Sequence, residues 1–187
     1  MKFQLVSLFS LLLSSATAAP SSPPEPKTFD IMALRSASPI HFSQVSAAKS
    51  GLFLDLPAQN ATCKGDESKG SATFYVENEE LVLYSSEGVK QKVFVDRSGM
   101  GQGIVGYITG DASLPRYGEL KGWKVDADQN LWFKDTGLIA CPNSIDGSWK
   151  IWLDLGLQQP GGNTGCLGFT ARTLEIAKPV SCQYTQV

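Results

Sequence analysis

Short apolar segments, separated by glycine, proline, asparagine and aspartate, recur along the chain from Phe29 onward. Many alternate apolar and polar residues with the period of two that marks a half-buried β-strand, and none shows the 3.6-residue period of a convincing helix. About twelve short strands at such close intervals predict a single-domain, all-β sandwich or barrel. The segments that carry the pattern are 29–36, 40–45, 52–56, 72–78, 80–85, 91–96, 103–109, 122–126, 130–135, 138–141, 149–155, 169–177 and 182–186.

Two of these regions resemble each other. FYVENEELVLYSSEG (74–88) and WKVDADQNLWFKDTG (123–137) both read aromatic-x-Val, an acidic polar turn, a second apolar run and glycine. Each predicts a β-hairpin, and their offset of about 49 residues leaves a β-trefoil open as an alternative fold. The Ala-Ala-Lys run inside 43–53 leaves room for one short helix.

The N-terminus has the composition of a secretory signal peptide. Lys2 supplies a positive charge, residues 3–13 are almost wholly apolar, and Ala-Thr-Ala at 16–18 is a cleavage signal. We expect cleavage after residue 18, a flexible proline-rich lead over 19–28, and one all-β domain over 29–187.

The charge balance narrows the classes of partner. The formal net charge is −2, and becomes −3 once the leader is removed. A nucleic-acid-binding surface needs clustered basic residues, so this balance argues against DNA or RNA and also against a membrane-lytic peptide. No later segment reaches the roughly 18 apolar residues of a membrane-spanning helix. We expect a secreted protein without a membrane span.

Four cysteines remain in the domain: Cys63, Cys141, Cys166 and Cys182. An even number in a secreted chain predicts two disulfides, because the extracellular environment is oxidising. Three pairings are open, of which we favour Cys63 with Cys141 and Cys166 with Cys182. Their wide spacing is unlike that of a zinc site, and no metal is expected. Asn60 begins the one N-glycosylation sequon, Asn-Ala-Thr, and we expect it to carry a glycan.

The stretch 95–110 contains Gly101-x-Gly103-x-x-Gly106, the spacing of a dinucleotide-binding fingerprint. The fingerprint works only when the glycines open a helix that holds the pyrophosphate. Here β-branched residues and further glycines follow, so we expect a strand ending at Asp96, a glycine-rich turn and a returning strand, with no cofactor.

The residues that could support catalysis are few. His41 is the only histidine, and no G-x-S-x-G motif accompanies it, which argues against a triad hydrolase. A glycosidase with two carboxylates is the alternative function left open. Its candidate carboxylates are Glu77, Glu79, Glu80, Asp126, Asp128, Asp146 and Asp154. Acidic hairpin tips are usually solvated turns, so we expect no catalytic residues and no enzyme.

Two tryptophans are candidates for contact with a polysaccharide. Strand alternation places Trp132 opposite Leu131 and Phe133, and Trp152 opposite Ile151 and Leu153. Both indoles therefore fall on the polar sides of their strands, where an exposed ring could pack on the C–H face of a sugar. We hypothesise that these two residues contact wall polysaccharide.

Several phrases together resemble the PhiA-type fungal cell wall proteins, over about residues 29–186. The resemblance implies a secreted, wall-associated glycoprotein linked to development of phialides and conidia, with no established catalytic residues. The phrases that carry it are VDRSGMGQG (95–103), IACPNSIDG (139–147), SAAKS (46–50), QNATC (59–63) and SCQYTQ (181–186).

Overall fold

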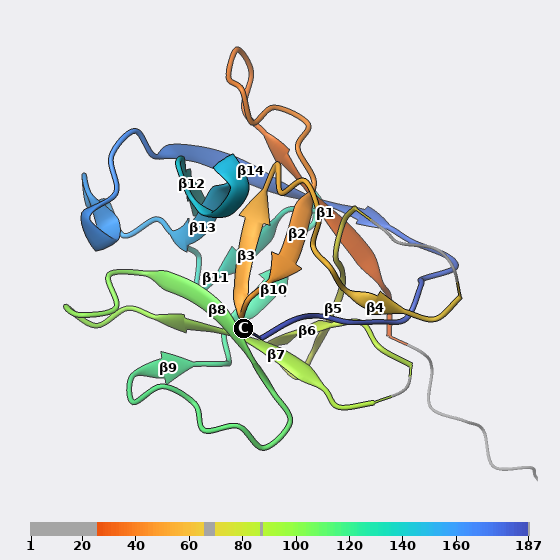
Figure 1. Ribbon diagram of the computed structural model, residues 1–187. Helices are drawn as coiled ribbons and strands as arrows, with labels where there is room; N and C mark the ends of the chain where they lie inside the picture. Colours follow the sequence, from red (N-terminus) through yellow and green to blue (C-terminus); the bar gives the residue numbers. More distant parts are fainter. Residues whose placement is uncertain (1–25, 66–69, 87, 187) are drawn as a thin grey trace, which may run out of the picture.

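The protein is an all-β domain, as the sequence predicts (Figure 1). The computed structural model describes residues 26–65, 70–86 and 88–186; the expected signal peptide (1–18) and most of the expected lead lie outside them. The strands of the described part are β1 (Phe29–Leu34), β2 (Val45–Ala48), β3 (Gly51–Leu54), β4 (Thr62–Cys63), β5 (Thr73–Glu77), β6 (Glu80–Leu83), β7 (Gln91–Asp96), β8 (Ile104–Thr109), β9 (Gly118–Glu119), β10 (Trp123–Val125), β11 (Leu131–Phe133), β12 (Leu138–Cys141), β13 (Trp149–Leu153), β14 (Leu167–Glu175) and β15 (Cys182–Gln183). Two short 3₁₀ turns are η1 (Ile145–Gly147) and η2 (Pro160–Gly162).

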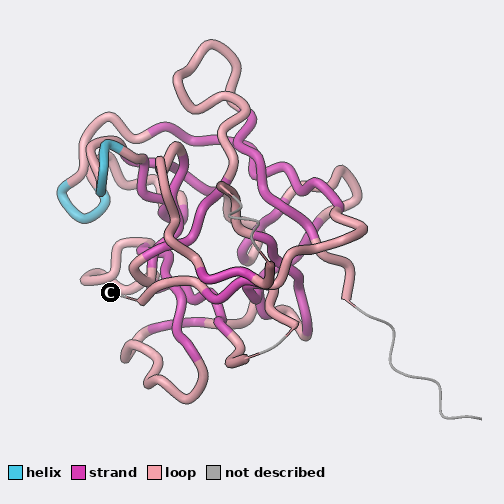
Figure 2. The backbone as a smooth tube through the Cα atoms, turned by 45° about the vertical axis from the view of Figure 1, so that its right-hand side comes forward, coloured by secondary structure: helices cyan, strands magenta, loops and turns pink. Residues whose placement is uncertain are grey.

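Nine strands form a closed antiparallel barrel in the order β3-β13-β12-β14-β1-β5-β6-β7-β8, and β8 pairs with β3 to complete the ring. Figure 2 shows the strands surrounding a common interior. Strand β2 extends the sheet from β3, and β9 extends it from β7. The pairs β10–β11 and β4–β15 form two small separate sheets. Of the two architectures predicted, the barrel is the one formed.

The barrel interior follows from strand alternation. On β13, Ile151 and Leu153 are fully buried in the main core, while Trp152 faces away from them. The β10–β11 hairpin adds Trp123 and Phe133 to the same core, with their ring centroids 5.0 Å apart in an edge contact. Aromatic pairs in this geometry add to the stabilisation from burial alone.

One local possibility is not realised and one expectation is wrong. Residues 45–48 form strand β2 and not a helix, because Lys49 and Ser50 both have positive φ (45° and 57°) and turn the chain into β3. Two positive φ values between paired residues make the tight hairpin turn whose twist matches the strands. The segment 40–45, expected as a strand, is a turn over 40–42; Gln44 forms an isolated bridge with Met32, and strand β2 begins at Val45.

Both predicted hairpins form, as β5–β6 and β10–β11. They are not equivalent, because β5 and β6 belong to the barrel ring whereas β10 and β11 make a sheet of their own. The nine-strand ring and this inequality do not support the trefoil alternative.

All four cysteines form disulfides, as expected, but the favoured pairing is wrong. The bonds are Cys63–Cys182 and Cys141–Cys166. Cys63 and Cys182 face each other in the β4–β15 pair, so the first bond links two short strands far apart in sequence. The second bond ties the loop before β14 to the end of β12.

The C-terminal segment after Cys182 is fixed by side chains of the barrel. The Thr73 amide donates to the Tyr184 hydroxyl at 3.1 Å. The Gln91 side chain accepts from the Tyr184 amide (2.8 Å) and donates to its carbonyl (2.9 Å). The Tyr107 hydroxyl donates to the carbonyl of Thr185. Figure 1 shows this end of the chain running between the strands.

The glycine-rich stretch is a turn between β7 and β8, as predicted, and strand β8 follows where a dinucleotide site needs a helix. The Asp96 carboxylate accepts from the Ser98 amide at 2.9 Å and fixes the turn. Gly103 has φ +89°, and a Cβ there would lie 2.6 Å from the Leu153 carbonyl oxygen. A Cβ on Gly106 would lie 2.8 Å from the carbonyl oxygen of Ser50, so this glycine lets the β2–β3 turn approach β8. The glycines therefore serve strand packing.

Candidate functional site

The clearest candidate site is a groove beside the start of β1. Two adjoining hollows, of about 520 and 700 Å³, share the lining residues Lys27, Thr28 and Glu175, and the pair is called the groove. These volumes fall in the range of pockets that bind small organic ligands. One half is bordered by β5 and the segment after β6, and the other by the β10–β11 hairpin.

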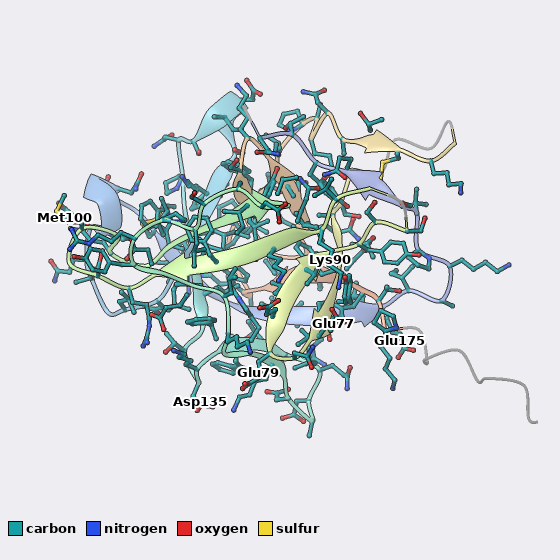
Figure 3. All side chains as sticks on the ribbon, turned by 90° about the horizontal axis from the view of Figure 1, so that it is seen from below. Glu77, Glu79, Lys90, Met100, Asp135 and Glu175 are labelled. Carbon is teal, nitrogen blue, oxygen red and sulfur yellow. A yellow bond between two sulfur atoms is a disulfide. The ribbon has the colours of Figure 1, made fainter. Side chains whose placement is uncertain are left out.

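Tyr75 and Tyr84 line the first half of the groove. Burial raises the pKa of the Tyr75 hydroxyl, so this group stays a neutral hydrogen-bond donor. Lys90 interacts with the same hydroxyl and forms an ion pair with Glu77 at 2.7 Å. That hydrogen bond to Glu77 is the main reason why the pKa of Lys90 is raised. Figure 3 shows Glu77, Lys90 and Glu175 on the same side of the molecule.

Asp126 lines the second half of the groove and closes the turn of the β10–β11 hairpin. Its carboxylate accepts from the Asn130 amide at 2.8 Å and from the Trp132 indole N–H at 2.7 Å. These two bonds, led by the one from the Asn130 backbone, lower the pKa of Asp126. The groove thus carries a carboxylate that stays ionised, and Trp132 lies directly behind it.

The two tryptophans proposed as sugar contacts differ in their exposure to solvent. Trp132 is half-buried, with its N–H held by Asp126. Trp152 is only 6% exposed, so the expectation that it presents an open indole is wrong. Its side chain does point away from the core, as alternation predicts, but it packs with Ile139 and the Cys141–Cys166 disulfide under the η2 loop. A stapled loop covers the outer side of β13, which strand alternation alone does not reveal.

The residues considered for catalysis are not brought together. The ring Nδ1 of His41 accepts from the Arg35 amide at 3.1 Å and so fixes a turn. Glu77 pairs with Lys90, and Glu80 pairs with Lys92 at 2.8 Å. The other candidates, Glu79, Asp128, Asp146 and Asp154, lie exposed at turns or strand ends. Within the described ranges, no group of three or more histidine, cysteine, aspartate or glutamate side chains could hold a metal ion.

Asn60, the predicted glycosylation site, is exposed and lies in the loop before β4. Its neighbour Gln59 is buried, and the Gln59 side chain accepts from the Ala47 amide at 3.2 Å and donates to the Ser71 carbonyl at 3.0 Å. The loop is therefore anchored on one side of Asn60 while the asparagine faces solvent.

Sequence reasoning missed the groove itself. Tyr75, Tyr84 and Glu175 stand in predicted strands, but nothing in their spacing says that β5 and β14 flank β1. The available signal was two tyrosines in one hairpin, which alone does not distinguish a groove from a core.

Known proteins that are similar in sequence identify the family of this chain. The sequence matches the family described as PhiA-like secreted protein over residues 29–185. The chain belongs to this family. It is 47% identical to cell wall protein phiA of Aspergillus fumigatus, over 92% of this chain and 93% of the relative. It is 47% identical to the protein of the same name in Emericella nidulans (93% and 95% covered) and 43% identical to that of Arthroderma benhamiae (97% and 100%).

The family assignment confirms the resemblance seen in the sequence and places the protein among secreted cell wall proteins. No solved structure matches the fold significantly. Across the described segments, no helix has the length and apolar character needed to cross a membrane.

Proposed function

We propose that this protein binds polysaccharide of the fungal cell wall through the groove beside β1. The observation that carries the proposal is the groove's lining: the half-buried Tyr84, the largely buried Tyr75, Glu77 with its ion pair to Lys90, and the ionised Asp126. Sugar rings present apolar C–H faces and a rim of hydroxyls, and sites for such ligands combine aromatic surface with a few placed polar groups.

We further propose a role in phialide and conidium development, which rests on the family membership. A wall protein of this kind acts by being retained where the spore-bearing cell is built. Export through the signal peptide at residues 1–18 and a glycan on Asn60 belong to the same proposal. Sequencing the secreted protein from its N-terminus checks the first of these.

The electrostatics argue against the two-carboxylate hydrolase. A glycosidase needs one carboxyl whose pKa is raised so that it can donate a proton to the leaving group. In this groove the pKa of Asp126 is lowered, and Glu77 is held by Lys90. Neither group suits the role of general acid.

Retention of purified protein on insoluble β-glucan and chitin tests the binding function. We expect Tyr84→Ala, Glu175→Gln and Trp132→Ala each to weaken retention. Tyr117→Ala is the matched control, because Tyr117 is an exposed tyrosine outside the groove. Equal retention of Tyr84→Ala and wild type would show that the groove does not bind the polysaccharide. Release of soluble sugar from oligosaccharides, abolished by Asp126→Asn, would instead support the hydrolase.

A deletion strain tests the developmental role. We expect it to form fewer conidia, and expect the wild-type gene to restore them better than a gene carrying Tyr84→Ala. Full conidiation in the deletion strain would contradict the role in development and leave the binding assay unaffected.

A further inference from the structure

Phe42 stands in a β-bulge where the chain returns from β1 toward β2. The Phe42 amide donates to the Ala33 carbonyl at 2.9 Å, and the Ala33 amide donates to the Ser43 carbonyl at 2.8 Å. Two residues of one segment therefore oppose one residue of β1. Phe42 has φ +69°. This combination defines the bulge type whose first residue is normally glycine.

A phenylalanine at this position is conformationally unfavourable. Left-handed backbone angles bring a Cβ too close to the main chain, and a bulky residue there is an outlier. Strained residues of this kind persist where the surrounding structure enforces them, and they concentrate at functional sites. Phe42 is the only aromatic residue among the described non-glycine residues with positive φ, so its ring stands there at a conformational cost that glycine would avoid.

The loop that carries Phe42 is firmly held. Ile40 is fully buried beneath it. The Ser38 hydroxyl donates to the Arg35 carbonyl at 2.8 Å, and the Arg35 guanidinium donates to the Gly168 carbonyl at 2.8 Å. His41 accepts from the Arg35 amide, and its ring stacks on the Phe42 ring with centroids 3.8 Å apart. The Phe42 ring is thus backed by an imidazole on a fixed loop.

The ring is nevertheless open to solvent. Phe42 is 64% exposed, the most exposed aromatic side chain in the described part of the chain. The loop 35–44 protrudes from the barrel (Figure 1, the orange loop at the top) and contains Arg35 as its only strongly charged residue. Its other exposed side chains are small or polar apart from Pro39. The loop therefore presents one aromatic ring among small and polar side chains, and none of residues 35–44 is a carboxylate.

We propose that Phe42 is a stacking platform for the apolar face of a pyranose ring in a neutral wall polysaccharide. The ring packs on the C–H face of the sugar, while the polar rim meets its hydroxyls. A neutral chain fits because the loop itself carries no carboxylate, and the guanidinium of Arg35 is engaged with the Gly168 carbonyl. This inference rests on the proposed function and adds a second contact, at the end of β1 opposite the groove.

An apolar protein partner fits this surface less well. Protein interfaces are organised around clusters of apolar anchors with a polar rim around them. Phe42 stands alone among polar neighbours, so it offers the area of one ring. A single sugar unit matches that size. The experiment therefore also distinguishes a protein partner from a polysaccharide.

The experiment compares Phe42→Gly, Phe42→Ala and Phe42→Trp in the full secreted protein. Glycine accepts the left-handed angle, so Phe42→Gly should melt no more than about 2 °C below the wild type and above Phe42→Ala. Retention of Phe42→Gly on insoluble β-1,3-glucan and on chitin should fall about fivefold, because one aromatic contact with the sugar is lost. Phe42→Trp should keep retention. Using the two polysaccharides separately shows which one supplies the ring.

Three results would overturn the inference. If Phe42→Gly binds as the wild type while Tyr84→Ala does not, only the platform is wrong and the groove stands. If Phe42→Gly melts well below the wild type, the ring serves the fold. If binding to native walls depends on Phe42 but binding to deproteinised walls does not, the partner is a protein. Failure of the wild type to bind any polysaccharide refutes the proposed function itself.

Discussion

The two disulfides should differ in their contribution to stability, because they close loops of very different length. Cys63–Cys182 spans 119 residues and Cys141–Cys166 spans 25. Loss of chain entropy in the unfolded state grows with the logarithm of loop length. It predicts a contribution of about 5 kcal/mol for the long loop and about 3.5 kcal/mol for the short one. Replacing Cys63 and Cys182 by alanine should therefore cost about 1.4 kcal/mol more than replacing the other pair.

The packing terms of the two variants are closely matched. Each pair has one buried sulfur, Cys182 at 2% and Cys141 at 0% exposure, and one half-buried partner. Equilibrium unfolding in urea without reductant, followed by tryptophan fluorescence, gives the free energy of unfolding of each double-alanine variant. The free energies extrapolated to water are compared, because cross-links also change the denaturant slope. If the Cys141/Cys166 variant is the less stable of the two, the loop-entropy reasoning fails.

Three further predictions concern charge, backbone and modification. Hydrogen bonding from Arg97 lowers the pKa of Glu119 from its ordinary 4.5 to about 2. The ionised carboxylate therefore contributes its full stabilisation of the folded state above pH 4.5, and this contribution is lost as the pH falls through 2. The free energies of unfolding of the wild type and of Glu119→Gln should therefore converge as the pH falls from 4.5 to 2. A difference between them that stays constant over this pH range would contradict the prediction. Gly103→Ala should cost about 2 kcal/mol or more in urea unfolding, because its Cβ would meet a backbone oxygen of β13, whereas Gly99→Ala, with nothing within 4 Å, should change little. Asn60→Gln should abolish a glycosidase-sensitive mobility shift of the secreted protein on gels; no shift in the wild type would refute glycosylation.

Local pattern predicted most strands, because each depends on its own alternation and on nearby turn residues. β7 and β12 begin and end where the sequence indicates. The errors arose where distant segments decide the outcome. The Ala-Ala-Lys run left room for a short helix, but its two alanines are held in a strand by pairing with β3. The disulfide partners of Cys63 and Cys141 depend on which strands meet, and spacing carries no information on that.

In the candidate site too, local pattern predicted the side of the strand on which a residue lies but not what covers it. Alternation correctly set Trp152 against the core residues Ile151 and Leu153, yet could not foresee the loop that covers it. Conversely, Phe42 was assigned to a strand by its apolar neighbours, and the positive φ that makes it notable appears only in three dimensions. Exposure and backbone strain are properties of the folded chain, so single-sequence patterns do not report them.

The anchored C-terminal segment has a consequence for survival among extracellular proteases. A carboxypeptidase that has digested the chain as far as Thr185 meets a residue whose carbonyl accepts from the Ser50 amide at 3.1 Å, and then the buried Tyr184. Further digestion requires the C-terminal segment to detach from the barrel, and the Cys63–Cys182 disulfide still holds this segment to β4. Digestion from that side should therefore stall at Tyr184, leaving the barrel intact.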